Sequence, residues 1–325
     1  MIIWKQVSQS GNRAGLSPMT IRETGSIILI ALIAWFSYIS GLPLLLFPEL
    51  GALSNCVITR PQHIWARSPY HLAFMPALTG CIGVLAARLF GFGVSPVLLV
   101  LISSLLLLSL FRSPIIPSLS SSLIPLVLDI HSWAYPLSVF LSCIILAIIS
   151  HFHAQKLKIP HYDAKTFRLF NGDWCHNSYH LVIFLGFIAG VAFIAHISRQ
   201  QIILFPPLAV LGFEVLLHPD KHPWRHSPLP LMLIFFLSAT GGFLAFSLCG
   251  HTVLGIVMAV SLSICMTFWR GLYVPTAIAV SLLPFVMQRV SPAFPFEITF
   301  GVVMLVGVAM ARDWLTNQIT RISGA

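Results

Sequence analysis

The chain has 325 residues but only 18 basic and 9 acidic side chains, which is 8% of its length, against about a quarter in soluble domains. An apolar fraction of 57% and a mean hydropathy of +0.91 exclude a water-soluble domain, because folding always leaves a large exposed surface; they predict an all-α polytopic membrane protein. The net charge of +9 does not indicate nucleic-acid binding, because the basic residues are scattered singly between apolar stretches.

After an N-terminal tail (1–24), the chain carries eight apolar stretches of roughly the twenty residues that a membrane-spanning helix needs. They lie near 26–46, 70–87, 91–111, 134–152, 181–198, 229–249, 252–269 and 295–311. Between them lie shorter apolar pieces near 48–58, 115–128, 206–217 and 274–287, each with a proline at or near its start. These pieces predict broken or re-entrant helices, and we expect their ends to converge on a cavity, because lipid cannot satisfy irregular backbone.

The second half of the chain repeats the first at an offset of 158 to 161 residues. LLFPELGAL, from Leu45, recurs as ILFPPLAVL, from Ile203, and FRSPIIP, from Phe111, recurs as WRGLYVP, from Trp269. Hydrophobic bias alone would not align proline, tryptophan and arginine. The sequence therefore predicts two tandem repeats of about four spans each (25–153 and 178–313), joined by a basic linker (154–177) and followed by a C-terminal tail (314–325). Repeats with broken helices at matching positions are typical of transporters.

Four spans per repeat return the chain to its starting side, which favours parallel repeats with the N-terminal tail, the linker and the C-terminus on one side. All three segments are basic, and basic segments favour the cytoplasm: Lys5, Arg13, Arg22, Lys156, Lys158, Lys165, Arg168, Arg312 and Arg321. The loops assigned to the opposite side are basic as well, which reduces the difference in basic residues between the two sides of the membrane: Arg60, Arg67, Lys221 and Arg225. We expect an integral protein of a bacterial inner membrane, surrounded by lipid, with both termini in the cytoplasm.

Two proline-led segments resemble the HPP family of four-helix integral membrane proteins, which is named after a His-Pro-Pro tripeptide followed by a small-residue run. The matching segments are IIPSLSSSLIP, from Ile115, and YVPTAIAVSLLP, from Tyr273. Only Pro117 and Pro275 keep the last position of the tripeptide, and its histidine is absent from both copies. Because some members of this family are associated with nitrite transport, the resemblance implies a permease for a small anion.

The residues at the start of these two segments independently indicate an anion site. A helix that begins within the membrane presents unpaired N–H groups and about half a positive charge, and proline and hydroxyl residues suit its first turn. The residues that fit are Pro117, Ser118, Ser120, Ser121, Pro275 and Thr276. Arg112 and Arg270 each precede such a proline by five residues, and we expect both to attract the anion. The alternative is that both arginines are interfacial anchors at the ends of spans.

Three acidic residues are candidates for carrying a proton in coupled transport: Glu49 at the first broken piece, Glu214 in the third, and Asp129 after the serine segment. A structural or loop-end carboxylate is the alternative for each. The histidine and cysteine spacings at 173–180 and 218–226 do not predict a metal site. Because no nucleotide, haem or nucleophile motif is present, we expect no cofactor and no enzymatic activity.

The sequence thus predicts a transporter or channel for a small inorganic anion, with its site between the two repeats. A membrane-embedded enzyme, or an assembly partner without its own transport pathway, is the alternative. The substrate, the coupling ion and the existence of a homo-oligomer stay open.

Overall fold

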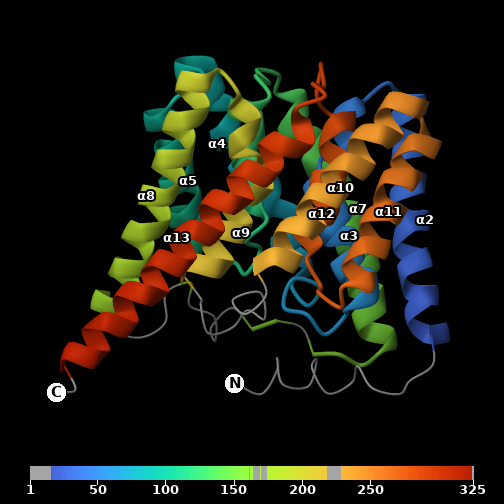
Figure 1. Ribbon diagram of the computed structural model, residues 1–325. Coiled ribbons are helices and arrows are strands. Elements are labelled where there is room, and N and C mark those ends of the chain that lie inside the picture. Colours follow the sequence, from blue (N-terminus) through green and yellow to red (C-terminus); the bar gives the residue numbers. More distant parts are fainter. Residues whose placement is uncertain (1–15, 161, 164–168, 170–173, 218–227, 324–325) are drawn as a thin grey trace.

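The computed structural model describes residues 16–160, 162–163, 169, 174–217 and 228–323. Every regular element within these ranges is a helix, and six helices are long and apolar enough to cross a membrane. The protein is therefore an all-α polytopic membrane protein, as the composition predicts (Figure 1). Helices α5 (Val94–Leu110) and α11 (Val253–Trp269) have 17 residues each, which is close to the shortest helix that spans the hydrocarbon core.

The helices of the two halves correspond one to one. The first half consists of α2 (Leu16–Ser40), α3 (Glu49–Thr59), α4 (Pro69–Phe90), α5, α6 (Ser118–Val127) and α7 (Ala134–Lys156). The second half consists of α8 (Trp174–Ser198), α9 (Pro206–Leu217), α10 (Pro228–Cys249), α11, α12 (Pro275–Leu282) and α13 (Phe294–Ser323). The duplicated sequence thus produces the same order of long and short helices twice.

The first and the last of the described helices extend furthest beyond the predicted domain limits. Helix α2 begins at Leu16, inside the segment predicted as an N-terminal tail, and α13 continues to Ser323, through the predicted C-terminal tail. Hydropathy marks only the part of a helix that suits lipid, whereas the backbone hydrogen bonds of a helix can continue into water. The apolar stretches therefore give helix lengths that are too short at these two ends.

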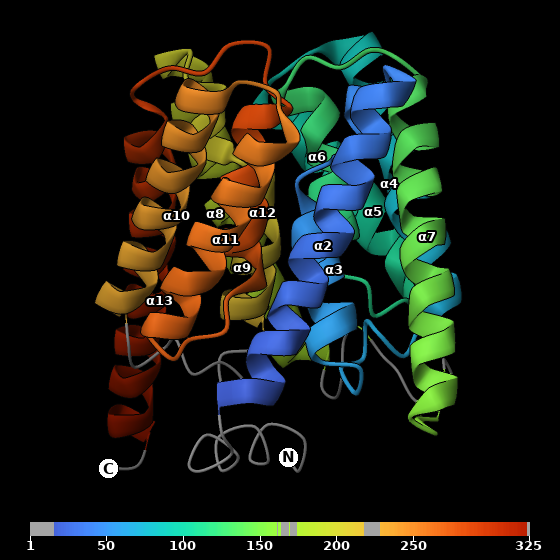
Figure 2. The same ribbon diagram turned by 90° about the vertical axis from the view of Figure 1, so that its right-hand side faces the viewer.

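The two halves run in the same direction. In Figures 1 and 2, α2 and α8 begin at one face of the molecule, and α7 and α13 end at that face. We call it the linker face, because α7, which precedes the linker, ends there and α8, which follows the linker, begins there. Contacts between the halves are reciprocal: α3 packs on α12 and α9 on α6, while α2 packs on α11 and α8 on α5. This exchange of partners is what a two-fold relation between parallel repeats produces.

Proline determines where the four short helices begin. Pro48 and Pro117 cap α3 and α6, and Pro206 and Pro275 are the first residues of α9 and α12. Proline suits a first turn because its missing N–H is not needed there and its φ is already helical. The 3-10 helix η1 (Pro43–Leu45) precedes α3, and the 3-10 helix η3 (Gln201–Leu204) precedes α9. Between α5 and α6, and between α11 and α12, the backbone is not helical. The short helices are thus the broken segments that the sequence predicts.

Close packing against α4 places the start of α6 deep inside the molecule. The hydroxyl of Thr79, the eleventh of 22 residues in α4, donates a hydrogen bond of 2.8 Å to the carbonyl oxygen of Ser118. One turn further along α4, a Cβ on Gly83 would overlap the carbonyl oxygen of Ser122. Helices α10 and α12 repeat this contact, because a Cβ on Gly242 would overlap the carbonyl oxygen of Ser281. Glycine at these two positions lets the short helices approach the long ones.

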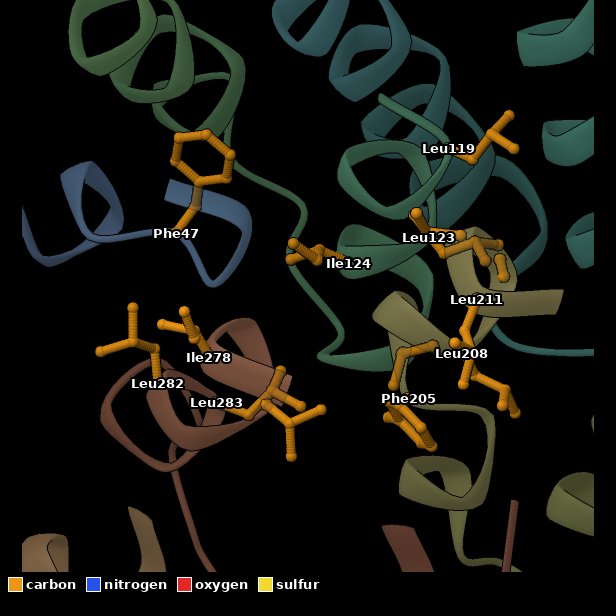
Figure 3. Close-up of a cluster of buried hydrophobic side chains, with 14 of the residues drawn as sticks. Phe47, Leu119, Leu123, Ile124, Phe205, Leu208, Leu211, Ile278, Leu282 and Leu283 are labelled. Carbon is orange, nitrogen blue, oxygen red and sulfur yellow. The ribbon is translucent and has the colours of Figure 1, made fainter. Parts of the chain in front are cut away.

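The short helices meet in an apolar core. Figure 3 shows its side chains, which come from all parts of the broken segments and are buried: Phe47, Leu119, Leu123, Ile124, Phe205, Leu208, Leu211, Ile278, Leu282 and Leu283. The sequence led us to expect a cavity where these helices converge. The structure brings the helices together, but their facing side chains are mostly aliphatic, and the polar groups lie at the helix ends instead.

Candidate functional site

The two arginines expected at the anion site lie on the surface. Arg112 follows the end of α5 and Arg270 the end of α11, and both side chains are exposed. The hydroxyl of Tyr162, in the linker, donates a hydrogen bond of 2.7 Å to the carbonyl oxygen of Arg112, which places this helix end at the linker face. Burial, with Asp163 nearby, raises the pKa of Tyr162 to about 12, so the hydroxyl stays protonated and can donate.

The guanidinium of Arg270 lies 5.2 Å from the ring centroid of its neighbour Trp269, which is a cation–π contact at the surface. Both positions fit the alternative stated above, an interfacial anchor. The structure does not bring either arginine to the buried serines of α6.

The two arginines are also not equivalent in the repeat. Arg112 is the residue with left-handed backbone that ends α5: its φ is 48°, and its N–H donates a hydrogen bond to the carbonyl oxygen of Ser109. At the end of α11 this place belongs to Gly271, whose φ is 63° and whose N–H bonds to the carbonyl of Phe268. Both ends have the hydrogen-bond pattern of a Schellman motif. By the hydrogen bonds of the helix ends, Arg112 therefore aligns with Gly271, and Arg270 lies one residue before the equivalent position.

The serines predicted at the start of α6 are all fully buried. Pro117 caps the helix, and the hydroxyls of Ser118 and Ser121 have no hydrogen-bond partner among the residues that the structure describes. The N–H groups of residues 118–121 bond to carbonyls of the preceding turn, at 2.9 to 3.3 Å. The sequence led us to expect these N–H groups to be unpaired. The hydroxyls, rather than the backbone, are thus the free donors at this helix end.

The matching threonine at the start of α12 has the same character. Thr276 follows Pro275, is 4% exposed, and its hydroxyl finds no partner within the described part of the chain. A buried hydroxyl without a partner loses its hydrogen bonds to water and gains none in return. Such groups at the first turns of two short helices can therefore bind a further polar group.

Glu49 joins the start of α3 to the start of α6. It is the first residue of α3 and is 2% exposed, and its Oε1 accepts a hydrogen bond from the hydroxyl of Ser120. Its Oε2 has no partner among the described residues. A carboxylate at a helix N-terminus is favoured by the helix dipole, although its burial is costly. Of the three acidic candidates, Glu49 is the one that the structure places within the buried serine cluster.

The other two acidic candidates lie elsewhere. Asp129, on the connection from α6 to α7, has an 80% exposed side chain and pairs with His131 at 2.9 Å. That connection is at the face opposite the linker, because α7 begins there and ends at the linker face. Glu214 is partly buried in the last turns of α9 and lies within electrostatic range of Cys56 on α3. Within the described part of the chain, neither residue forms a hydrogen bond or an ion pair with the serines of α6, and Asp129 belongs to the surface.

A second polar cluster, between the two repeats, was missed by the sequence analysis. The guanidinium of Arg60, after α3, lies 3.4 Å from the ring centroid of Tyr273, before α12. On α3, the amide of Asn55 donates a hydrogen bond of 2.5 Å to the carboxylate of Glu23 of α2, which lies within electrostatic range of Arg60. Arg60 is half-buried and contacts Tyr273 of the other repeat, so it is a cation between the repeats. Arg112 and Arg270, by contrast, are exposed.

The position of Arg60 also corrects the predicted topology. From the sequence we expected Arg60 and Arg67 on the side opposite the linker. The Nε of Arg67, however, donates a hydrogen bond of 2.8 Å to the carbonyl of Pro160, and the N–H of Tyr162 bonds to the carbonyl of Arg67. The loop is at the linker face because the broken segment 41–59 crosses back after α2. The related basic residues Lys221 and Arg225 lie outside the described residues.

Arg312, counted above only as a basic residue near the C-terminus, is 4% exposed. Its guanidinium donates hydrogen bonds to the carbonyls of Val215 and Leu216, at 3.0 and 3.1 Å, and pairs with Asp313 at 2.7 Å. These carbonyls end α9, where a cation is favoured by the helix dipole. Arg312 therefore has a structural role that its position in the sequence did not indicate.

The three histidines considered above at 218–226 lie outside the described residues. Elsewhere in the described ranges, no three His, Cys, Asp or Glu side chains are grouped to hold a metal ion. No protein-family model, curated protein or solved structure matches the chain. A proposal about function therefore depends on the buried groups themselves.

Proposed function

We propose that the protein transports a small inorganic anion through the interface between its two parallel repeats, with both termini in the cytoplasm of a bacterium. The resemblance to the HPP family, some of whose members are associated with nitrite transport, agrees with this proposal. The observation that carries it is a set of buried hydroxyls that have no hydrogen-bond partner among the described residues, at the first turns of α6 and α12: Ser118, Ser121 and Thr276.

The physical reason concerns hydration. An anion that enters the membrane must replace its hydrogen bonds to water, and buried hydroxyls are donors that have no competing partner. The positive end of a helix dipole favours negative charge at the same place. In a poorly screened interior, each of these interactions is stronger than it would be in water. Three unpartnered hydroxyls at two helix starts thus suit a small anion better than a bulky or apolar substrate.

The cluster of Arg60 and Tyr273 suits a role at the linker-face end of the pathway. Arg60 lies in the loop after α3 of the first repeat, whereas Tyr273 lies just before α12 of the second. A half-buried guanidinium in this place raises the local concentration of anions. Because the contact between Arg60 and the ring of Tyr273 joins the two repeats, we expect this contact to break when the repeats move apart.

Anion uptake into proteoliposomes tests the proposal. Isotope-labelled nitrite, nitrate, bicarbonate and chloride are offered to the purified protein, and uptake is normalised to inserted protein. Ser118→Ala and Ser121→Ala each remove one donor, and a loss of about 1.4 kcal/mol of binding would lower apparent affinity roughly tenfold. Ser122→Ala is the matched control, because the Ser122 hydroxyl already donates to the carbonyl of Leu119, at 2.7 Å.

We expect weaker uptake in the first two variants and nearly unchanged uptake in the control. Uptake of all four anions no faster than in protein-free liposomes would refute the proposal and favour a membrane-embedded enzyme or an assembly partner. Equal uptake in wild type and in both serine variants would refute the site.

A further inference from the structure

We infer that the anion travels with one proton, which is carried by Glu49, and that the hydroxyl of Ser120 links the two. This inference rests on the proposed function and specifies its coupling ion. It makes the protein a symporter of one proton with one monovalent anion, rather than a passive channel.

The geometry places the carboxyl group and the anion-binding hydroxyls on neighbouring turns. Glu49 is the first residue of α3, and its Oε1 accepts a hydrogen bond from Ser120 on the first turn of α6. Ser118 and Ser121, whose hydroxyls are without partners in the described structure, flank Ser120 on the same turn. A charged carboxylate here would repel an anion bound to these serines, because the interior screens charge poorly.

Among the described residues, no cation forms an ion pair with Glu49, and the basic side chains of α7 lie in the last turns of that helix, at the end opposite Tyr135: His151, His153 and Lys156. Helices α6 and α12 contain no ionisable side chain. From α7, Tyr135 and Cys143 lie within electrostatic range, and both are neutral acids at ordinary pH. From α2, which also packs on α3, Glu23 is bound to Asn55, and Arg22 is exposed.

Ser120 can link the proton to the anion because a hydroxyl has a single hydrogen to donate. When Glu49 is charged, that hydrogen is directed to the carboxylate. When a proton binds Glu49, the new O–H of the acid donates to the oxygen of Ser120, and the serine hydrogen becomes free for the anion. Proton and anion then bind together and leave together on the other side. The only bond made and broken is the O–H bond of the Glu49 carboxyl.

The second repeat shows that the fold does not need this polar pair. The repeated Phe-Pro sequence aligns Glu49 with Pro207, and the matching glycine contacts align Ser120 with Ala279. Both members of the pair are thus apolar in the other copy, although α9 and α12 still pack together there. A buried carboxyl group that the same architecture can do without is costly to keep, which favours a role in transport.

Proton flux in the wild-type protein gives the first test. Nitrate and chloride are the probes, because nitrous acid and carbon dioxide cross bilayers uncharged. An inward gradient of either anion should acidify weakly buffered proteoliposomes. In the reverse experiment, each pH unit of gradient, acid outside, should support accumulation of about tenfold, since one pH unit and one tenfold concentration ratio have the same free energy.

Glu49→Gln gives the second test, because its amide donates to Ser120 permanently and imitates the protonated acid. We expect accumulation driven by a pH gradient to disappear, whereas exchange of labelled for unlabelled anion continues and no longer depends on pH. Asp129→Asn removes a charge from an exposed acid and is the matched control, with wild-type coupling. Should Glu49→Gln fail to insert, the wild-type flux measurement still decides.

The outcomes separate the two proposals. Uptake without proton movement in the wild type, or accumulation driven by a pH gradient in Glu49→Gln, would overturn this inference and leave anion transport standing. Absence of both uptake and exchange for every anion would overturn the proposed function itself. Proton flux that accompanies the anion in wild type and Asp129→Asn, but not in Glu49→Gln, supports both.

Discussion

Replacing Gly83 by alanine tests whether α6 begins beside the middle of α4, on which the burial of the serine cluster depends. The added Cβ would overlap the carbonyl oxygen of Ser122 and approach the ring of Pro125 to 3.1 Å. Neither obstacle is the flexible end of a side chain, so α4 and α6 must move apart. We therefore expect Gly83→Ala to destabilise the protein.

The magnitude follows from two opposing effects. Overpacking of a core costs about 1–3 kcal/mol, and a clash with backbone lies at the upper end of that range. Alanine is intrinsically more favourable than glycine in a helix by about 1 kcal/mol, which leaves a net loss of roughly 2 kcal/mol. Gly190→Ala in α8 is the control, because its Cβ would meet nothing within 4 Å and only the helix gain remains.

Thermal unfolding of the purified protein in detergent measures the difference. With on the order of 2–4 °C per kcal/mol, Gly83→Ala should unfold several degrees below wild type, and Gly190→Ala at or above it. Gly242→Ala, the matching change in the second repeat, should resemble Gly83→Ala, because it meets the carbonyl of Ser281 in the same way. If both variants were as stable as Gly190→Ala, the close approach of the short helices would be refuted.

Two further predictions concern the helix ends and the topology. Arg312→Gln should lower the free energy of unfolding by about 1–3 kcal/mol, because it leaves two carbonyls of α9 and a carboxylate without their cation; Arg289→Gln, at an exposed position, should change unfolding by less than about 0.5 kcal/mol. In a background without native cysteines, a membrane-impermeant thiol reagent should label Gln62→Cys from the linker face and Ser132→Cys from the opposite face. Labelling of both from one face would contradict the topology.

The positions of the broken helices could be predicted because proline acts locally. Pro48, Pro117, Pro206 and Pro275 restrict the backbone through their own covalent geometry, whatever packs around them. The internal repeat supported each predicted helix start a second time, since each of these prolines has a counterpart in the other repeat at nearly the same offset. The composition, the prolines and the repeat together were enough to predict the fold class and the places of α3, α6, α9 and α12.

The charged groups could not be placed in this way, because their positions depend on register and pairing. Aligning the prolines matches Arg112 with Arg270, but the helix ends before them are one residue out of step, which only their hydrogen bonds reveal. The contact of Arg60 with Tyr273 requires α3 to pack on α12 of the other repeat, and nothing in the local sequence states this pairing. To predict the side of the membrane on which Arg60 lies, one must also know that the broken segment 41–59 returns the chain to the linker face.

The two copies have diverged in a way that bears on the number of sites. The contacts between backbones are kept, as Gly83 and Gly242 show, because any larger side chain there would push a short helix out of place. The polar pair is not kept, because Pro207 stands where the first copy has Glu49. A pair of identical sites related by the two-fold axis is therefore ruled out by the residues themselves. If the buried carboxyl group is what binds the proton, each molecule carries one proton per cycle, and the symmetric scaffold supports a single asymmetric site.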